Sequence, residues 1–401
     1  MEKIDWKHIH MFKRHHKLNI QSFLLISFIF FMFLFCAIEL SCKESPKEIE
    51  LLKKISSNYI KQTIKSSKNL KEAATKAGIT EDELRSICKA LSIDIGFYDE
   101  EIDPFSLPSA QKLTSAEYEP EVIAVFNSES PYILLVEKSV HKIYLLKYEN
   151  GRKTLVNVFD CKTGKNRGDK KEEGDHKTPE GIFFLVTKYS RNNIRSMVGE
   201  DNAYQYGEMA FAINFPNHID QSNGKNGSGI WLHGTDEMFS ETSSYDTRGC
   251  VVTTNETIKT LSKYIELQKT PLIIVETLKF NKKKDYIAQK QEFFAILEGW
   301  RSAWEEERIE EYINYYSPTF ERDGRNRSQY KSYKANEIFK NVKINHIKLD
   351  NIMLLKYNDG MIARFFQDYS ASNMSVKNVK TLYFVKSNNS WKIIAERFGN
   401  N

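Results

Sequence analysis

Apolar residues recur at helical spacing in the first part of the chain, between residues 46 and 98. Leu52, Ile55 and Tyr59 follow one another at intervals typical of a helix, and Thr80 with the acidic residues after it has the form of a helix N-cap. We therefore expect a small helical module here. Its apolar stripe fits either a packing face against the next domain, which we favour, or the surface of a homodimer.

Short runs of β-branched and aromatic residues follow in the middle of the chain and predict a mostly β domain. The expected strands cover residues 132–136, 142–146, 154–159, 181–186 and 272–276, with a helix near 255–267. Pro104, Pro108 and Pro120 precede this domain, and with the Ser and Thr residues between them they predict a linker or a segment that lies over the surface.

The end of the chain has the pattern of a separate α+β domain. Residues 286–316 have the apolar spacing of a long helix or a helix pair. Four alternating segments follow, at residues 343–355, 361–369, 381–386 and 391–398. This order predicts a cone-shaped domain whose aromatic residues form the core or line a pocket for glycan or peptide: Trp300, Trp304, Tyr312, Tyr315 and Tyr316.

The amino terminus has the pattern of an export leader or membrane anchor, because a basic cluster at residues 13–17 precedes an apolar run at residues 23–38. Since basic flanks stay in the cytoplasm, the rest of the chain is expected outside it, in the periplasm or cell envelope. Three outcomes remain open: a cleaved signal peptide, a lipid attached to Cys42, or an uncleaved anchor that tethers the protein to the membrane.

Composition and cysteine content narrow the class of protein. The 401 residues are enough for more than one folded unit, and 41% hydrophobic with 28% charged residues is typical of a globular protein. The net charge of +5 comes from scattered lysines, which argues against nucleic acid as a partner. Cys36 and Cys42 belong to the leader, so an odd number of cysteines remains outside the cytoplasm. We expect Cys250 to be free, and Cys88 and Cys161 to be small buried residues.

The clearest chemical signal is a histidine followed at short distance by a cysteine. His233 ends an apolar run, and Cys250 follows Arg248 and Gly249. A neighbouring imidazole can generate a thiolate nucleophile, and glycine lets backbone N–H groups approach an oxyanion. Arg248 either lowers the thiol pKa and binds a carboxylate, or only packs the loop. Together these residues predict acyl transfer by a cysteine nucleophile.

A metal centre would need further ligands at suitable spacing. His218, Asp220 and Asp236 do not form a recognisable zinc pattern. We therefore expect neither a metal nor another cofactor.

The two segments together resemble the signature of the L,D-transpeptidase (YkuD-type) catalytic domain family. The first is His233-Gly234-Thr235 and the second is Thr247-Arg248-Gly249-Cys250, with sixteen residues between the histidine and the cysteine. Thr178-Pro179-Glu180-Gly181 is similar to the Thr-Pro-x-Gly turn of the same family. Arg248 departs from the pattern, because many members have histidine there.

This resemblance implies a β-sandwich in which Cys250 is the nucleophile and His233 is the general base. It also implies that a backbone carbonyl orients His233, with Asp236 and Asp246 as the weaker alternatives. The surrounding residues are then expected to bind the oxyanion and the substrate: Gly234, Thr235, Thr247, Arg248 and Gly249.

The order of the segments is similar to that of the cell-shape-determining L,D-carboxypeptidases of curved and helical bacteria, which end in a nuclear-transport-factor-2-like (NTF2-like) cone. The domains expected on this basis are a leader at 1–42, a helical region and linker at 43–125, the catalytic domain at 126–280 and the NTF2-like domain at 285–401.

The closer resemblance implies an enzyme whose partners are peptidoglycan stem peptides. It would attack the L,D bond before the terminal D-alanine of a stem tetrapeptide and leave a tripeptide. The alternatives are a transpeptidase that forms crosslinks or attaches a protein to the wall, and a catalytically silent wall-binding protein.

Overall fold

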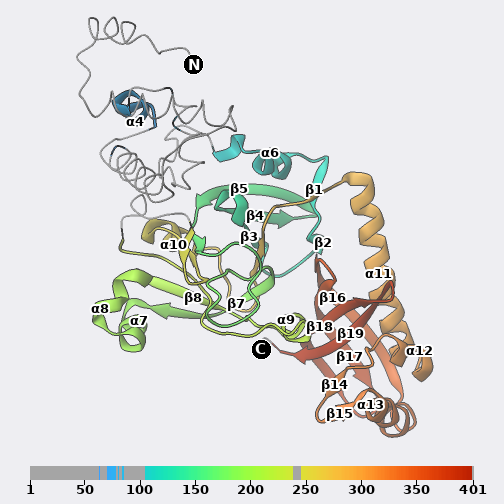
Figure 1. Ribbon diagram of the computed structural model, residues 1–401. Helices are drawn as coiled ribbons and strands as arrows, with labels where there is room; N and C mark the ends of the chain where they lie inside the picture. Colours follow the sequence, from blue (N-terminus) through green and yellow to red (C-terminus); the bar gives the residue numbers. More distant parts are fainter. Residues whose placement is uncertain are drawn as a thin grey trace, which may run out of the picture. The chain divides into compact units, whose positions relative to one another are not determined.

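The computed structural model describes residues 104–237 and 245–399, together with residues 63, 70–77, 80 and 84. The chain divides into two compact units, Met1–Ile102 and Asp103–Asn401. In the first unit the structure describes helix α4 (Leu70–Ala77), which buries Ala73, Ala74 and Ala77 (Figure 1). The predicted leader, Cys88 and most of the predicted helical module lie outside the described residues. Among the residues described, no helix has the length and apolar character needed to cross a lipid bilayer.

The second unit begins with a curved sheet of eight strands, in the order β11-β9-β8-β7-β12-β3-β4-β5. The strands are β3 (Tyr132–Glu137), β4 (Lys142–Glu149), β5 (Arg152–Asp160), β7 (Gly181–Ser190), β8 (Met209–Ile213), β9 (Trp231–His233), β11 (Val251–Val252) and β12 (Pro271–Val275). β7 changes its partner along its length, because Gly181 to Phe184 pair with β12 and Leu185 to Ser190 pair with β8. Two sheets therefore share this strand and fold over each other.

Apolar side chains fill the space between these two sheets. Leu134 and Val136 come from one sheet, and Phe211, Leu232 and Val251 come from the other. All five are at most 1% exposed. Cys161, which is also buried here, is a free thiol. The predicted β-sandwich is therefore confirmed, and burial of both faces of its central strands β3 and β12 explains the continuous apolar runs there.

Short helices and strands complete the sandwich. They are α7 (Arg191–Val198), α8 (Glu200–Ala203), α9 (His218–Ser222), α10 (Asn255–Leu261), β6 (Thr163–Gly164) and β10 (Tyr245–Thr247). α10 ends at Leu261, earlier than the sequence pattern predicts. β6 and β10 pair in parallel and bring the segment before Cys250 beside the loop that follows β5.

The C-terminal domain packs helices against one face of an antiparallel sheet. Its helices are α11 (Lys283–Glu305), α12 (Ile309–Asn314) and α13 (Arg327–Tyr333), followed by a π-helical turn at Lys334–Phe339. The strands are β14 (Glu321–Arg322), β15 (Arg325–Asn326), β16 (Ile344–Tyr357), β17 (Gly360–Ala371), β18 (Ser375–Ser387) and β19 (Ser390–Phe398). The predicted α+β cone is confirmed, with a helix pair over the region expected to hold one or two helices.

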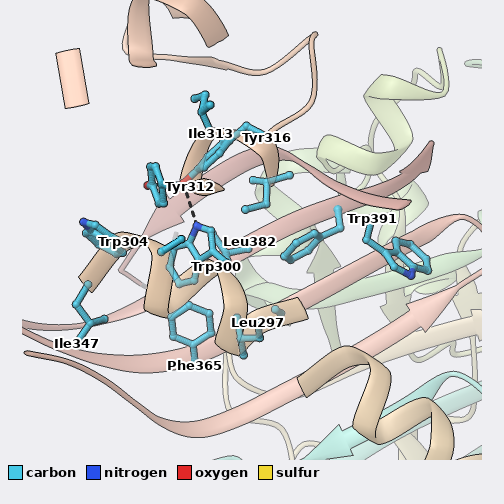
Figure 2. Close-up of a cluster of buried hydrophobic side chains, with 14 of the residues drawn as sticks. Leu297, Trp300, Trp304, Tyr312, Ile313, Tyr316, Ile347, Phe365, Leu382 and Trp391 are labelled. Atoms are coloured by element: carbon cyan, nitrogen blue, oxygen red, sulfur yellow. Dashed lines mark hydrogen bonds between the residues drawn. The ribbon is translucent and has the colours of Figure 1, made fainter. Parts of the chain in front are cut away.

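The predicted pocket aromatics of this domain belong to its core. Trp300, Tyr312 and Tyr316 are at most 1% exposed, Trp304 is 5% exposed, and Tyr315 is partly buried against them. Figure 2 shows the side chains of Trp300, Tyr312 and Tyr316 close together, with the Trp300 indole donating a hydrogen bond to the Tyr316 hydroxyl. Packing of aromatic rings is therefore their role in this structure.

A strand from the expected linker joins the C-terminal sheet. β2 (Ile123–Phe126) pairs antiparallel with β16, which gives the five-stranded order β19-β18-β17-β16-β2. All four residues of β2 are buried. β1 (Tyr118–Pro120) pairs in turn with β13 (Phe280–Lys282), and α6 (Pro108–Thr114) precedes both. The linker prediction missed these strands, because an apolar run of four residues does not reveal a partner so far along the chain.

The second face of the C-terminal sheet packs against the catalytic domain. Leu355, Ile362 and Tyr383 from this face share one apolar cluster with Ile133 and Leu135 of β3. The two domains are therefore joined by a continuous core, and their relative position is fixed by apolar burial.

Candidate functional site

Two neighbouring strands bring His233 and Cys250 together. β9 ends at His233, and β11 begins at the residue after Cys250. The two strands pair in parallel, with Leu232 opposite Val251 and His233 opposite Val252, so Cys250 lies level with Trp231. Both side chains line one cavity of about 580 Å³. Its size is within the range of small-molecule sites, which is about 300–1,000 Å³.

His233 is buried and is oriented by the backbone. Its Nδ1 lies 2.6 Å from the Gly234 carbonyl oxygen, and because a carbonyl can only accept, Nδ1 carries the proton and Nε2 keeps its lone pair. The Tyr206 ring packs against the imidazole, with centroids 4.9 Å apart. Burial lowers the pKa of His233 to about 4, although the bond to Gly234 opposes this shift. The imidazole is therefore a neutral base at neutral pH.

Cys250 is held as a neutral thiol. Its Sγ lies 3.5 Å from the Gly229 carbonyl oxygen, to which it donates. Burial raises the pKa of Cys250 to about 11, while the Trp231 backbone N–H and the charges of Arg248 and Lys170 act in the opposite direction. With both groups neutral, the thiolate forms only when the imidazole takes the proton during attack.

The Thr247 side chain stabilises the loop before Cys250 with two hydrogen bonds. The Thr247 hydroxyl donates to the Cys250 carbonyl oxygen at 2.7 Å and accepts from the Gly249 N–H at 3.1 Å. Gly249 has a φ of +130°, and a Cβ there would lie 2.7 Å from the Lys177 carbonyl oxygen. Only glycine fits this position, because a side chain would displace the backbone that supports the loop.

The turn at residues 178–181 supports the loop before Cys250. Buried Thr178 accepts a hydrogen bond from the Gly164 N–H at 2.8 Å. The next residue but one, Glu180, pairs with buried Lys138 at 2.8 Å and accepts from the Tyr357 hydroxyl at 2.5 Å. Since Tyr357 ends β16, the turn beneath Cys250 is bonded directly to the C-terminal domain.

The residues after His233 contribute in different ways. A Cβ on Gly234 would lie 2.4 Å from the Asn255 Oδ1, so a larger residue there would displace the Asn255 side chain. Thr235 is buried and lines the cavity. Asp236 forms an ion pair with Arg191 at 2.6 Å and accepts a hydrogen bond from Asn255 at 2.7 Å. The Gly234 carbonyl, and not Asp236, is therefore the group that orients the imidazole.

Of the residues predicted for the site, five line the cavity: His233, Thr235, Thr247, Arg248 and Cys250. Gly234 and Gly249 do not line the cavity. They contribute because a side chain at either position would clash with neighbouring atoms. Arg248 is exposed at the cavity wall, and its charge lowers the pKa of the thiol.

Two further residues of the cavity lining, Tyr206 and Lys170, were not predicted from the sequence. Tyr206 packs against both His233 and Trp231 but belongs to a distant turn after α8. Lys170 is 3% exposed and pairs with Asp175 at 2.7 Å. The dense charge of residues 164–174 was the signal that could have pointed to Lys170.

Two loops that are held together by hydrogen bonds form one wall of the cavity, the charged loop at residues 164–174 and the glycine-rich loop at residues 222–229. The Asn226 N–H donates to the Lys171 carbonyl oxygen at 2.9 Å, and the Asn226 side chain accepts from the Glu173 N–H at 2.9 Å. Lys225 pairs with Asp169 at 2.8 Å and with Asp220 at 3.0 Å. These contacts hold Gly229 in place as the acceptor for Cys250.

Comparisons with known protein families cover both domains. Residues 131–274 match the L,D-transpeptidase catalytic domain (YkuD). Residues 292–397 match the Cds6 C-terminal NTF2-like domain. No curated protein sequence matches this chain.

Solved structures combine the two domains as this chain does. Bd1075 of Bdellovibrio bacteriovorus is 31% identical, with a TM-score of 0.61 over 71% of this chain and 98% of that one. The helical cell shape determining protein Pgp2 of Campylobacter jejuni is 27% identical, with a TM-score of 0.54 over 71% of this chain and 95% of that one. Enzymes with the matched catalytic domain are cysteine-dependent and act on peptidoglycan stem peptides. The chain therefore belongs to the YkuD-type L,D-transpeptidase family, in a form that ends in an NTF2-like domain.

Proposed function

We propose that the protein is an exported L,D-carboxypeptidase that removes the terminal D-alanine from peptidoglycan stem tetrapeptides during cell-wall remodelling. The observation that carries this proposal is the neutral pair of His233 and Cys250 on adjacent strands of one cavity. Because Nδ1 is committed to the Gly234 carbonyl, Nε2 is the nitrogen available to accept the thiol proton. Likeness to a cell shape determining protein supports a role in cell shape.

The first half of the proposed reaction forms a thioester. Nε2 of His233 accepts the thiol proton as Sγ attacks the carbonyl carbon of the L,D bond. The imidazolium then returns the proton to the leaving amine of D-alanine as the C–N bond breaks. In the second half, His233 takes a proton from water, whose oxygen attacks the thioester and releases the tripeptide carboxylate and the thiol.

Backbone N–H groups are the natural donors for the oxyanion in this reaction. The Gly249 N–H already donates to the Thr247 hydroxyl. The Cys250 N–H makes no hydrogen bond to any described residue. We therefore assign oxyanion binding to the Cys250 N–H and a positioning role to Gly249 and Thr247.

The charges around the cavity suit a stem peptide, which carries carboxylates and a free amine. Positive side chains on the lining include Arg248 and Lys170, and negative ones include Glu173, Glu237 and Asp246. A carboxylate of the substrate would be attracted to the first group and its amine to the second. The volume of about 580 Å³ also leaves space for an amine acceptor, which favours transpeptidation as the second candidate.

The test is incubation of the purified protein with disaccharide tetrapeptides, followed by mass spectrometry. Cys250→Ala is the control, and its melting curve shows whether it is folded. We expect tripeptide and D-alanine with the unmodified protein and no turnover with Cys250→Ala. A crosslinked dimer would establish transpeptidation instead, and unchanged substrate in both samples would leave only the wall-binding alternative.

A further inference from the structure

The segment between β7 and β8 contributes to the wall of the catalytic cavity, although the proposed reaction gives it no role. It contains α7, α8 and a tight turn at Tyr204–Tyr206. Tyr206 lines the cavity, and its ring lies 4.9 Å from the His233 imidazole and 5.3 Å from the Trp231 indole, measured between ring centroids. An aromatic ring therefore covers the residue proposed as the general base.

A small apolar cluster holds the Tyr206 ring in place. Ile194, Ala203 and Ala210 are fully buried in this cluster, and Tyr206 and Trp231 pack against it. The members come from α7, α8, β8 and β9 as well as from the turn itself. Because close packing from several elements leaves a side chain little room to move, the ring has one preferred position over the imidazole.

Polar contacts join the same turn to the residues that follow His233. Arg191 of α7 donates to the Gly207 carbonyl oxygen at 2.7 Å and pairs with Asp236 at 2.6 Å. Asn255 donates to Asp236 at 2.7 Å. Asp236 therefore acts as the anchor of the segment that carries the aromatic ring, and not as a partner of the imidazole.

The two backbones also touch directly at this point. Gly207 has a φ of +61°, and a Cβ there would lie 2.6 Å from the carbonyl carbon of Gly234 and from the nitrogen of Thr235. Glycine is thus the residue that fits here, because any side chain would push the turn away from the end of β9. The turn and the strand that ends at His233 are consequently held as one unit.

The ring of Tyr206, and not its hydroxyl, is the part that packs against His233. The hydroxyl accepts a hydrogen bond from Arg248. His233 is 4% exposed and has no ion-pair partner among the described residues, so its charged form would lose hydration without gaining a counter-charge. This burial lowers the pKa of His233 to about 4. The Tyr206 ring is one of the groups that produce it.

We propose that Tyr206 is a positioning residue of the catalytic site, whose ring fixes the His233 imidazole and keeps water from it so that it remains a neutral base. Arg191 and Asp236 set the strength of this effect, because they hold the turn against the end of β9. The inference rests on the proposed function where activity is measured. The effect on the imidazole itself does not require a substrate.

The first test follows the His233 imidazole by NMR in the full chain with isotope-labelled histidine, between about pH 4 and 8. His233→Gln assigns the signal. Tyr206→Ala removes the ring and admits water, so we expect the pKa of His233 to rise by about one pH unit or more. Tyr206→Phe keeps the ring and should leave it unchanged. The charged side chains that line the cavity are the same in both variants: Lys162, Lys170, Glu173, Glu237, Asp246 and Arg248.

The second test measures kcat and KM on tetrapeptides across the same pH range. Because a higher pKa leaves less neutral imidazole in acid, the acid limb of kcat/KM should move to higher pH in Tyr206→Ala, in step with the NMR result. At neutral pH we expect kcat to fall about tenfold or more and KM to change little. A purely structural role would not move the acid limb.

Two further variants complete the design, and a melting curve shows whether each is folded. The control Tyr204→Ala changes a 43% exposed ring of the same turn and should leave the pKa of His233 unchanged. Arg191→Met loosens the turn and should raise that pKa by less than Tyr206→Ala does, and it decides the question if Tyr206→Ala does not fold.

The proposal is overturned if the imidazole of Tyr206→Ala titrates as in the unmodified chain, or if Tyr206→Phe raises its pKa equally. Tetrapeptide left intact by the unmodified chain would refute the proposed function instead, and the NMR titration would still decide the role of Tyr206.

Discussion

The catalytic pair and the interior of the C-terminal domain both bury ionisable side chains, but they do so in opposite ways. Glu396 pairs with Arg322 at 2.6 Å and Lys380 at 3.2 Å, and it also accepts from the Tyr316 hydroxyl. Burial raises the pKa of Glu396, yet these cations more than offset it and leave the pKa below its usual value. His233 and Cys250 have no ion-pair partner among the described residues, so burial determines their pKa values.

This difference separates a structural cluster from a reactive one. In the C-terminal interior the Glu396 carboxylate is paired with Arg322 and Lys380, within a core of buried aromatic rings. At the cavity the thiol and the imidazole are neutral, and Nε2 of His233 keeps an unused lone pair. A carboxylate paired with buried cations stabilises the fold, whereas neutral groups at a cavity wall can exchange protons with a substrate.

The largest expected effect comes from breaking the ion pairs of Glu396. Glu396→Gln removes the carboxylate that faces Lys380 and Arg322 and leaves buried cations uncompensated. We expect the free energy of unfolding to fall by about 3–5 kcal/mol, measured by urea denaturation. The control Glu310→Gln breaks an exposed pair with Lys331 and should change it by less than about 1 kcal/mol. Equal effects of the two variants would refute the contrast.

Gly249→Ala should affect the catalytic site more than the fold. The added Cβ would lie 2.7 Å from the Lys177 carbonyl oxygen and displace Cys250. We expect kcat/KM on tetrapeptides to fall about 100-fold or more. Gly151→Ala is the matched control, because Gly151 also has a positive φ but has open space around it and lies in the turn between β4 and β5. Normal turnover by Gly249→Ala would show that the loop tolerates the shift.

The pH dependence of alkylation distinguishes a neutral pair from an ion pair. Because burial raises the pKa of Cys250 to about 11, the thiolate fraction should still be rising at pH 9. The rate of iodoacetamide modification, followed by mass spectrometry of the Cys250 peptide, should increase about tenfold per pH unit between pH 6 and 9. A rate that is constant from pH 6 to 8 would instead indicate a preformed thiolate and imidazolium.

The smallest effect is expected where the two regions meet. Tyr357→Phe removes the hydroxyl that donates to Glu180 while keeping the ring. We expect a loss of about 1 kcal/mol in unfolding free energy. We also expect a modest decrease in kcat, because the turn that contains Thr178 and Glu180 loses its hydrogen bond to the C-terminal domain. The control is Tyr132→Phe, since the Tyr132 hydroxyl makes no hydrogen bond to any described residue. If both variants behave alike, the Tyr357 contact does not couple the domains.

Locally encoded features were the ones that could be predicted from the sequence. The hairpin between β16 and β17 turns at Asn358, and the one between β18 and β19 turns at Asn388 and Asn389, all with positive φ. Asparagine tolerates this backbone conformation, so these turns can be predicted from the sequence without knowledge of the fold. The pairing of β2 with β16 could not be predicted, because nothing in the four residues of β2 specifies a distant partner.

The candidate site shows the same division. The resemblance carried by residues around His233 and Cys250 identified both groups, because motif chemistry is short and local. Tyr206, Lys170 and the Gly229 carbonyl reach the site from separate loops, and only the packed structure brings them there. The predicted membrane tether and the homodimer remain predictions.

The sequence by itself determined the two domain folds, the family and the pair of residues expected to react, since each depends on short-range patterns of apolar spacing and motif order. Tertiary structure alone decided which groups are charged and how the domains are joined. Burial and counter-charges set the pKa values of Cys250, His233 and Glu396, and one apolar cluster shared by β3 and the C-terminal sheet joins the domains. Both depend on side chains that are distant in sequence and meet only when the chain is folded.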